Sequence, residues 1–294
     1  MGRIAYVDGR YVPHRTARVH VEDRGYQFAD GVYEVMAVVA GAFVDEEPHL
    51  DRLDRSLAAV RIRWPMSRAA LRVVLREMVR RNFPGGYGSV YLQITRGVAA
   101  RNHAFPAAAK PVLVMTARTL PPFDLAAARR GVRVITVDDE RWRRPDIKSV
   151  SLLPNVLAKQ LAVESGAFEA WLVDDEGLVT EGTASNAWIV TDQGEVVTRQ
   201  ADRSILAGIT RGSLMALVYA HGLRLIDRPF SVGEARAAKE AFLTSTTSWV
   251  KPVIAIDGVP IGSGAIGGLT ERLLEYYAGY VQAATEVNGG RERL

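Results

Sequence analysis

The sequence predicts an α+β protein with two domains. The chain has 294 residues, 48% of them hydrophobic, and this length usually divides into two cores. Strand-like and helix-like segments are mixed along the first 117 residues. A proline-rich segment then follows, Thr119-Leu-Pro-Pro-Phe-Asp124, and its composition is typical of a linker. We therefore expect domains at 1–119 and 125–284, a linker at 120–124 and a disordered polar tail at 285–294.

The first domain is predicted to combine strands with two long helices. Residues 4–12 alternate around Asp8-Gly9, which is the signal of a tight hairpin turn. Apolar residues at helical spacing predict helices at 50–61 and 67–82, and Ser67 is a suitable N-cap for the second. Further strands are expected at 33–39, 89–95 and 112–117.

The second domain is predicted to be richer in short strands. Four of them, at 169–173, 178–180, 187–191 and 196–198, are separated by turns rich in acidic residues and glycine, which predicts antiparallel pairing. A helix is expected to begin at Pro154 and to end before Gly166. The remaining expected elements are a helical turn at 125–130, strands at 132–137, 241–244 and 253–256, and helices at 210–221, 231–238 and 269–284.

Composition argues against several classes of protein. The net charge is +4 and the pI is about 9.4, but the arginines are scattered and often adjoin acids, so we expect no nucleic-acid partner. The longest uncharged apolar run, residues 35–44, is shorter than the roughly 18 residues of a membrane span, and no signal sequence is apparent. We expect a cytoplasmic protein without membrane association. The absence of cysteine excludes thiolate chemistry.

Two further patterns carry no site. The five histidines lack the spacing of metal ligands, so no metal site is expected. The segment Gly262-Ser-Gly264-Ala-Ile-Gly267 has the spacing of a dinucleotide-binding loop, but only 27 residues follow it and no second βα unit can be completed. We interpret this segment as a loop leading to the last helix.

Lys148 is the most informative single residue. The chain has 37 basic residues and only five lysines, and only a primary amine can add to a carbonyl group. The other four, Lys110, Lys159, Lys239 and Lys251, have the setting of surface charges. Lys148 instead lies in a strand-like segment after Arg141, Arg143 and Arg144, and such a cationic field is one way to lower an amine pKa.

Other residues have the properties of a cofactor site. The segment Gly208-Ile-Thr210 at a helix start suits a phosphate, and so do the hydroxyls of 244–248 and the charge of Arg52. The alternatives are ordinary capping by Thr210 and a surface salt bridge of Arg52. Glu181 could keep a ring nitrogen protonated, or it could be a simple turn residue. Together with a reactive lysine, these groups are the requirements for pyridoxal 5′-phosphate (PLP).

At this level of detail the chain resembles the fold-type IV PLP enzymes, from about residue 3 to about residue 280. The motifs that carry the resemblance are Glu22-Asp-Arg-Gly-Tyr-Gln-Phe-Ala-Asp-Gly-Val-Tyr33-Glu-Val, His49-Leu-Asp-Arg52-Leu, Asp146-Ile-Lys148-Ser, Asn155-Val-Leu-Ala-Lys-Gln160, Glu181-Gly-Thr-Ala-Ser-Asn186, Gly208-Ile-Thr-Arg211 and Thr244-Ser-Thr-Thr-Ser248. The resemblance implies a smaller α/β N-terminal domain and a larger, β-rich, barrel-like C-terminal domain.

The resemblance also implies the role of each site residue. Lys148 is the catalytic residue and binds PLP as a Schiff base. The other cofactor-binding residues are Glu181, Arg52, Arg141, Leu206, Ile209, Thr210, Ser245 and Thr246. The substrate-binding residues are Tyr33, Val35, Arg101, His103 and Thr247.

Within this group the sequence is most similar to the D-amino acid transaminases. The segment Thr95-Arg-Gly-Val-Ala-Ala-Arg101-Asn-His103 matches the loop that, in relatives, enters the neighbouring subunit and binds the substrate carboxylate. This implies a homodimer, D-amino acid and 2-oxo acid substrates, and ping-pong kinetics. Three alternatives remain: an L-branched-chain transaminase, an aminodeoxychorismate lyase and a PLP carrier without activity. Ala37 and Ala184 are smaller than in some relatives, which leaves the preferred side chain open.

Overall fold

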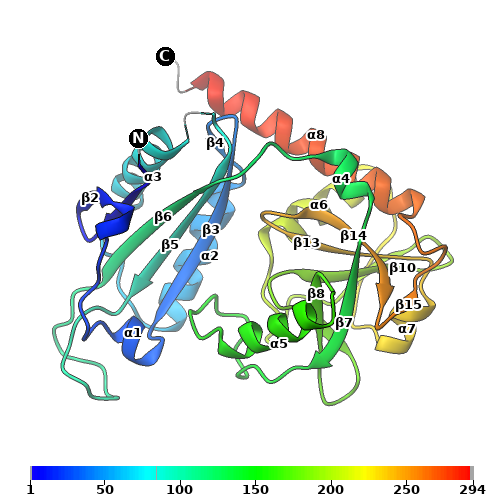
Figure 1. The fold of residues 1–294 in the computed structure, drawn as a ribbon, viewed down its shortest axis with the longest axis horizontal. Helices are drawn as coiled ribbons and strands as arrows, with labels where there is room; N and C mark the ends of the chain where they lie inside the picture. The colour runs from blue at the N-terminus through cyan, green and yellow to red at the C-terminus, as the bar shows by residue number, and fades with distance from the viewer. Residues whose placement is uncertain (1, 84, 292–294) are drawn as a thin grey trace. The chain divides into compact units, whose positions relative to one another are not determined.

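The chain forms two compact units in a computed structural model that describes residues 2–83 and 85–291 (Figure 1). The first unit consists of residues up to 122, the segment 147–151 and the chain from 281 onward. The second consists of 123–146 and 152–280. The division at 122/123 falls inside the expected linker. The segment 147–151 does not follow the expected boundary, because it is hydrogen bonded to the first sheet.

A six-stranded sheet in the order β2-β1-β6-β5-β3-β4 forms the centre of the first unit. Its strands are β1 (Ile4–Val7), β2 (Arg10–Pro13), β3 (Gly31–Val39), β4 (Ala42–Phe43), β5 (Gly88–Thr95) and β6 (Val112–Thr119). The predicted hairpin is confirmed, since Val7 pairs with Arg10 and both Asp8 and Gly9 have positive φ, as a type I′ turn requires.

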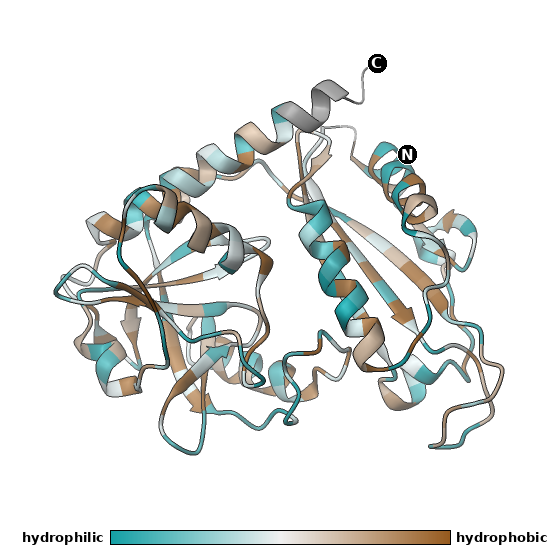
Figure 2. Cartoon of the chain, turned by 180° about the vertical axis from the view of Figure 1, so that it is seen from behind, coloured by the Kyte–Doolittle hydropathy of each residue, from teal (hydrophilic) through white to brown (hydrophobic). Residues whose placement is uncertain are grey.

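Two helices supply most of the apolar side chains that cover one face of this sheet. These are α2 (Glu46–Ala59) and α3 (Arg68–Asn82), and the predicted cap of α3 is confirmed because Ser67 accepts a hydrogen bond from the Ala70 N–H. Leu50 and Leu71 are fully buried with Met36 of β3. Figure 2 shows the apolar residues of these strands and helices in brown. Burying one such side chain stabilises the fold by about 1.5 to 3 kcal/mol.

The second unit contains a nine-stranded mixed sheet. Eight strands follow the order β12-β11-β10-β13-β14-β7-β8-β9, and β15 pairs with β14. They are β7 (Val132–Asp138), β8 (Glu169–Val173), β9 (Val179–Gly182), β10 (Asn186–Val190), β11 (Val196–Thr198), β12 (Leu225–Asp227), β13 (Glu240–Ser245), β14 (Trp249–Ile256) and β15 (Val259–Pro260).

The antiparallel meander predicted for this unit is only partly correct. The pairs β8/β9 and β10/β11 are antiparallel as expected. However, β10 also pairs with β13, a strand more than 50 residues later, and β9 ends the sheet beside β8. Parallel pairs join β7 to both β8 and β14, which local turn signals do not reveal.

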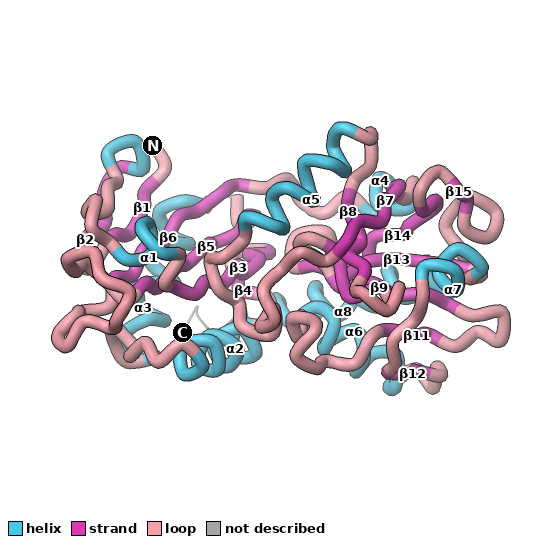
Figure 3. Tube along the Cα trace, turned by 90° about the horizontal axis from the view of Figure 1, so that it is seen from below, coloured by secondary structure: helices cyan, strands magenta, loops and turns pink. Residues whose placement is uncertain are grey.

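Helices α4 (Leu125–Arg129), α5 (Leu153–Glu164), α6 (Ile209–Ala220) and α7 (Val232–Ala237) belong to the second unit. Helix α8 (Gly268–Arg291) begins in the second unit and belongs to the first from residue 281. Figure 3 shows α5 beside β8. Helix α8 continues to residue 291, so the expected disorder is not seen at 285–291, and residues 292–294 lie outside the described part of the chain. Five short elements are not expected from the sequence: α1 (Arg24–Phe28), η1 (His14–Thr16), β4, β12 and β15.

The glycine-rich segment 262–267 leads to α8 as predicted. The start of that helix is already occupied by an acid, because Glu240 accepts hydrogen bonds from the Leu269 and Thr270 N–H groups. A Cβ at Gly267 would lie 2.0 Å from the Glu240 Cδ, so glycine is required for this approach. Gly267 therefore makes room for Glu240 to cap the start of α8.

No helix within 2–83 and 85–291 is both long enough and apolar enough to cross a membrane.

Candidate functional site

Lys148 is fixed against β3 through its backbone. Its carbonyl accepts a hydrogen bond from the Tyr33 N–H at 3.0 Å, and its own N–H donates to the Ser56 Oγ at 3.3 Å. The segment forms one isolated bridge, between Val32 and Ser149, so the predicted strand-like conformation is wrong beyond that bridge. The half-buried Lys148 side chain places Nζ 4.2 Å from the centre of the Tyr33 ring. The structure thus brings together two of the predicted site residues.

The expected cationic surroundings of Lys148 are wrong for two of the three arginines. Arg144 forms a two-point ion pair with Asp146, and Arg141 is paired with Asp139 and Glu181, so their charges are neutralised locally. The interpretation of Lys251 as a surface charge is wrong as well. Lys251 lies on β14, is half-buried, and has a pKa lowered by burial and by the nearby Arg130.

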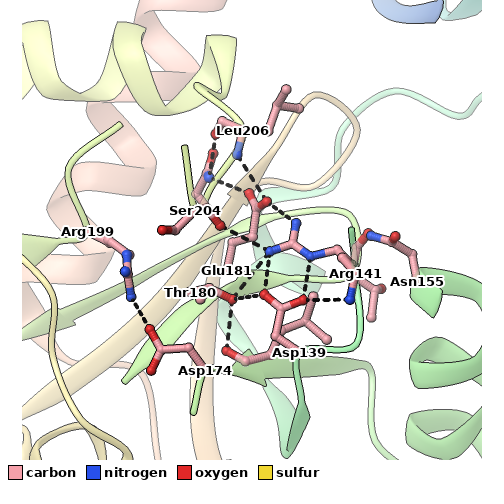
Figure 4. Close-up of polar contacts among 12 residues, drawn as sticks. Asp139, Arg141, Asn155, Asp174, Thr180, Glu181, Arg199, Ser204 and Leu206 are labelled. Carbon is pink, nitrogen blue, oxygen red and sulfur yellow. Dashed lines mark hydrogen bonds and ion pairs between the residues drawn. The ribbon is translucent and has the colours of Figure 1, made fainter. Parts of the chain in front are cut away.

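Glu181 lies on β9 at the centre of a buried polar network (Figure 4). Its Oε1 accepts hydrogen bonds from the Arg141 guanidinium and from the Leu206 N–H, the latter at 3.0 Å. Its Oε2 accepts one from the Asn186 Nδ2 at 3.0 Å. A carboxylate has about four acceptor positions, and these three donors leave one, on Oε2.

Arg141 divides its guanidinium between two acids. Its Nε and Nη2 donate to the two oxygens of Asp139 at 2.8 and 2.7 Å, whereas only Nη1 reaches Glu181. The Thr180 hydroxyl also donates to Asp139, at 2.8 Å. Figure 4 shows the guanidinium between the two carboxylates. Arg141 therefore donates two hydrogen bonds to Asp139 and only one to Glu181.

The pKa of Glu181 is raised above its ordinary value. Complete burial raises it, and the charge and hydrogen bond of Arg141 offset this only in part. Asp139 shows the opposite result: burial raises its pKa, but the hydrogen bonds and charge of Arg141 lower it below the ordinary value overall. Glu181 is consequently an acceptor that additional positive charge would stabilise in its ionised form.

Asn186 connects this network to the start of α6, a role that is not expected from the sequence. Its Nδ2 donates to Glu181 and to the Leu206 carbonyl, both at 3.0 Å. A Cβ at Gly208 would lie 2.0 Å from the Asn186 Oδ1. Asn186 also pairs with Thr244 across β10 and β13, at the start of the hydroxyl-rich turn. Its position as the last residue of the motif 181–186 was the available signal.

Helix α6 begins with features of an anion site. Its N-cap is Gly208, so the alternative of capping by Thr210 is wrong, and a glycine has no side chain with which to cap the first turn. Ile209 and Thr210 of the first turn are buried. The adjacent turn at 244–248 contributes the half-buried Ser245 and Thr246 and the exposed Thr247. Uncapped N–H groups beside hydroxyls are a chemically suitable cradle for a phosphate.

Arg52 lies in the first unit and is not a surface residue, so the alternative of a surface salt bridge is wrong. It is buried, and its Nε and Nη2 donate to the two oxygens of Glu34 at 2.7 and 2.8 Å. The His49 Nδ1 lies 2.7 Å from the Glu34 Oε2. Burial would raise the pKa of Glu34, but Arg52 and His49 lower it to about 2. The charge of Arg52 is therefore balanced within this triad.

The predicted substrate residues lie on the sheet and on one loop of the first unit. Tyr33 and Val35 are half-buried on one side of β3, and Tyr33 stacks on Tyr91 of β5. Arg101 and His103 are exposed, and both approach the ring of Phe28, with the Arg101 Cζ 4.6 Å from its centre and the His103 ring centre at 5.4 Å.

In the described part of the chain, no group of three or more acidic or histidine side chains could hold a metal ion.

The fold and these residues define a member of a known enzyme family. A family model described as amino-transferase class IV matches residues 31–256, which is well over half of the chain. The protein belongs to this family, and the predicted family resemblance is confirmed.

Individual relatives narrow the comparison. The chain is 43% identical to a D-alanine aminotransferase from Bacillus licheniformis over 90% of its length and 93% of that protein. It is 41% identical to a D-alanine aminotransferase from Listeria monocytogenes serotype 4b, over 96% and 97% of the two chains. A solved branched-chain amino acid aminotransferase from T.th., complexed with N-(5′-phosphopyridoxyl)-L-glutamate, matches with a TM-score of 0.88 and 26% identity, covering 96% and 95%. The predicted α+β fold class is confirmed.

Proposed function

We propose that this protein transfers amino groups between D-amino acids and 2-oxo acids with PLP as cofactor. The observation that carries the proposal is its similarity, at more than 40% identity and almost full length, to two D-alanine aminotransferases. The chain also carries each residue to which the family resemblance assigns a role in such a reaction. PLP supplies a ring that stabilises negative charge on the substrate Cα when that carbon loses its proton.

The residues described above fit the chemistry of PLP. Glu181 keeps one acceptor position on Oε2 and has a raised pKa, so a protonated ring nitrogen is a suitable partner. Leu206 and Arg141 hold that carboxylate in place. The N–H groups of Ile209 and Thr210, with the hydroxyls of Ser245 and Thr246, would bind the phosphate. Arg52, whose charge is shared with Glu34, would complete the phosphate site.

Lys148 would hold the cofactor through its ε-amine and move the proton at the substrate Cα. Its carbonyl and N–H are both fixed by hydrogen bonds, so the position from which the side chain extends is well defined. The Tyr33 ring beside Nζ limits the directions that the amine can take. A fixed amine delivers a proton to one face of Cα, which is the basis of stereospecific transfer.

Arg101, His103 and Tyr33 would bind the substrate carboxylate, and Val35 and Thr247 would line the substrate region. A guanidinium can bind a carboxylate through two parallel hydrogen bonds. None of the carboxylates described in the structure forms an ion pair with Arg101. Holding the carboxylate at one end would decide which hydrogen of Cα faces Lys148, and so the handedness of the substrate.

We further propose a cytoplasmic homodimer in which the loop with Arg101 and His103 serves the partner's active site. Helix α5 offers a surface suited to self-association, because it buries only alanines and exposes large apolar side chains. These are Leu153, Val156, Leu157, Leu161 and Val163. Multi-angle light scattering should give a mass of two chains, and a monomeric active enzyme would contradict the dimer.

A branched-chain L-amino acid transaminase is the second candidate, because the structural match at 26% identity is of that type. Aminodeoxychorismate lyase activity would use the same cofactor residues. The test is to mix the holoenzyme separately with D-alanine, D-glutamate, L-leucine and aminodeoxychorismate, and to follow the visible absorption of the bound cofactor. We expect D-alanine and D-glutamate to bleach it. Bleaching by L-leucine alone would overturn the D-specific proposal, and no change with any of the four would indicate a carrier.

A further inference from the structure

Helix α1 holds the backbone of the loop that carries Arg101 and His103. Arg24, the first residue of α1, is buried. Its Nη1 donates to the carbonyls of Asn102 and Ala104 at 2.5 and 3.4 Å, and its Nη2 donates to the carbonyl of His103 at 3.4 Å. One guanidinium thus binds three consecutive carbonyls around His103. A loop that is otherwise exposed is given a defined backbone path by this side chain.

Arg24 is itself held by Asp30, a half-buried acid. Its Nε donates to the Asp30 Oδ2 at 2.7 Å, and Asp30 also accepts two hydrogen bonds from Arg96, at 2.7 and 2.9 Å. Burial would raise the pKa of Asp30, but the hydrogen bonds from Arg96 and Arg24 lower it below its ordinary value. Arg96 further donates to the carbonyls of Val60 and Arg61. The loop is therefore connected through Arg24 and Asp30 to the rest of the first unit.

Phe28, at the end of the same short helix, contacts the side chains of Arg101 and His103. The Cζ atoms of Arg24 and Arg101 lie 4.9 and 4.6 Å from the centre of its ring, and the His103 ring packs edge-on at 5.4 Å. The negative face of an aromatic ring attracts a guanidinium by about 0.5 to 1 kcal/mol at an exposed site. Because Asp30 already balances the charge of Arg24, an arriving carboxylate would meet mainly the charge of Arg101 over this ring.

We propose that Arg24 and Phe28 are positioning residues for the substrate carboxylate. Arg24 fixes the backbone at 102–104, and Phe28 orients the side chains of Arg101 and His103 so that both can contact one anion. This inference rests on the proposed function, because it assigns a cause to the carboxylate binding proposed above. It extends the substrate site to residues of helix α1.

The test compares Phe28→Leu with Phe28→Tyr in the holoenzyme. Leucine keeps an apolar side chain without a ring face, whereas tyrosine keeps the ring. Tyr26→Leu is the matched control, because Tyr26 lies in the same helix but is 78% exposed. We expect Phe28→Leu to raise KM for D-alanine about three- to tenfold with kcat within about twofold, and Phe28→Tyr and Tyr26→Leu to stay near the wild type. Arg24→Lys, which keeps the charge but loses the fork, should raise KM by about tenfold or more.

Two measurements separate this inference from the proposed function. Calorimetric titration of the holoenzyme with propionate, a carboxylate that cannot react, should show weaker binding in Phe28→Leu and in Arg24→Lys. Amide hydrogen exchange at 101–105 should become faster in Arg24→Lys. If the wild type turns over D-alanine but Phe28→Leu changes neither KM nor propionate affinity, the positioning role is wrong. If the wild type does not react with D-amino acids, the proposed function is wrong. The exchange rates would still test whether Arg24 fixes the backbone at 102–104.

Discussion

Glu34 and Glu181 are both buried carboxylates paired with an arginine, yet their pKa values shift in opposite directions. In the first unit, the fork of Arg52 engages both oxygens of Glu34, and His49 adds a third contact. This lowers its pKa to about 2 despite burial. In the second unit, Arg141 offers Glu181 a single N–H and gives its fork to Asp139. Burial then prevails, and the pKa of Glu181 is raised.

The difference shows that the number of hydrogen bonds from an arginine helps to set the direction in which the pKa of a buried acid shifts. Glu34 is fully committed to holding Arg52, and its charge is permanent at any physiological pH. Glu181 is held in place by Arg141, Leu206 and Asn186 but is not satisfied electrostatically. Such a carboxylate gains from binding another cation, and a protonated ring nitrogen would provide it. Substitutions that exchange these properties test the comparison.

Glu34→Gln should have the largest effect, on stability. It leaves Arg52 buried without its charge partner, and breaking a buried pair in this way costs about 3 to 5 kcal/mol. Urea unfolding measures the free energy of unfolding directly. A loss below about 1 kcal/mol would show that Arg52 finds another partner and that the triad is not a structural unit.

The contribution of Glu34 to the free energy of unfolding of the wild type should be lost at low pH. The folded pKa of Glu34, about 2, lies below its usual 4.5, so its stabilising contribution is present above about pH 4.5 and is lost as the pH falls towards 2. His49 acts in the same direction, since burial lowers its pKa and unfolding lets it take up a proton at higher pH. The shift of Glu34 alone corresponds to about 3 kcal/mol. Unfolding free energies measured from pH 7 to pH 3 should fall less steeply in Glu34→Gln than in the wild type; equal slopes would contradict the assignment.

Glu181→Gln should affect activity more than stability. Arg141 keeps its fork on Asp139, so we expect little loss of folding free energy. The ring nitrogen would lose its charge partner, which is worth about two pKa units, and kcat should fall about 100-fold. Steady-state kinetics with D-alanine and the melting temperature should be measured together. A variant that is strongly destabilised but keeps its kcat would reverse the comparison with Glu34.

Asp139→Asn should have a smaller effect of the same kind. Removing this acid frees the fork of Arg141 to engage Glu181 more fully, which should lower the pKa of Glu181 and make it resemble Glu34. We expect kcat to fall about three- to tenfold and the pH titration of the bound cofactor's absorption to shift. Thr180→Val, which removes only a hydroxyl from the same network, is the control and should change both less.

Much of this organisation could be predicted from local sequence patterns. The hairpin at Asp8-Gly9 and the capped start of α3 at Ser67 depend on neighbouring residues and were predicted correctly. The pairing of β10 with β13 was not predictable, because it depends on contacts between distant segments. The partners of Glu181 were missed for the same reason: Asp139 lies more than 40 residues before it, and nothing local shows that both acids share Arg141. The motifs indicate which residues belong to the candidate site, but not which acid pairs with which arginine.

We propose that Lys148, one of the five lysines of the chain, holds the cofactor. Lys251 is the strongest competitor, because it is half-buried and has a lowered pKa. Reduction of the holoenzyme with borohydride would fix the cofactor permanently to its lysine, and peptide mass spectrometry would locate it. We expect a phosphopyridoxyl group on Lys148 and none in Lys148→Ala. A label on Lys251, or on any lysine in the Lys148→Ala variant at the wild-type level, would contradict it.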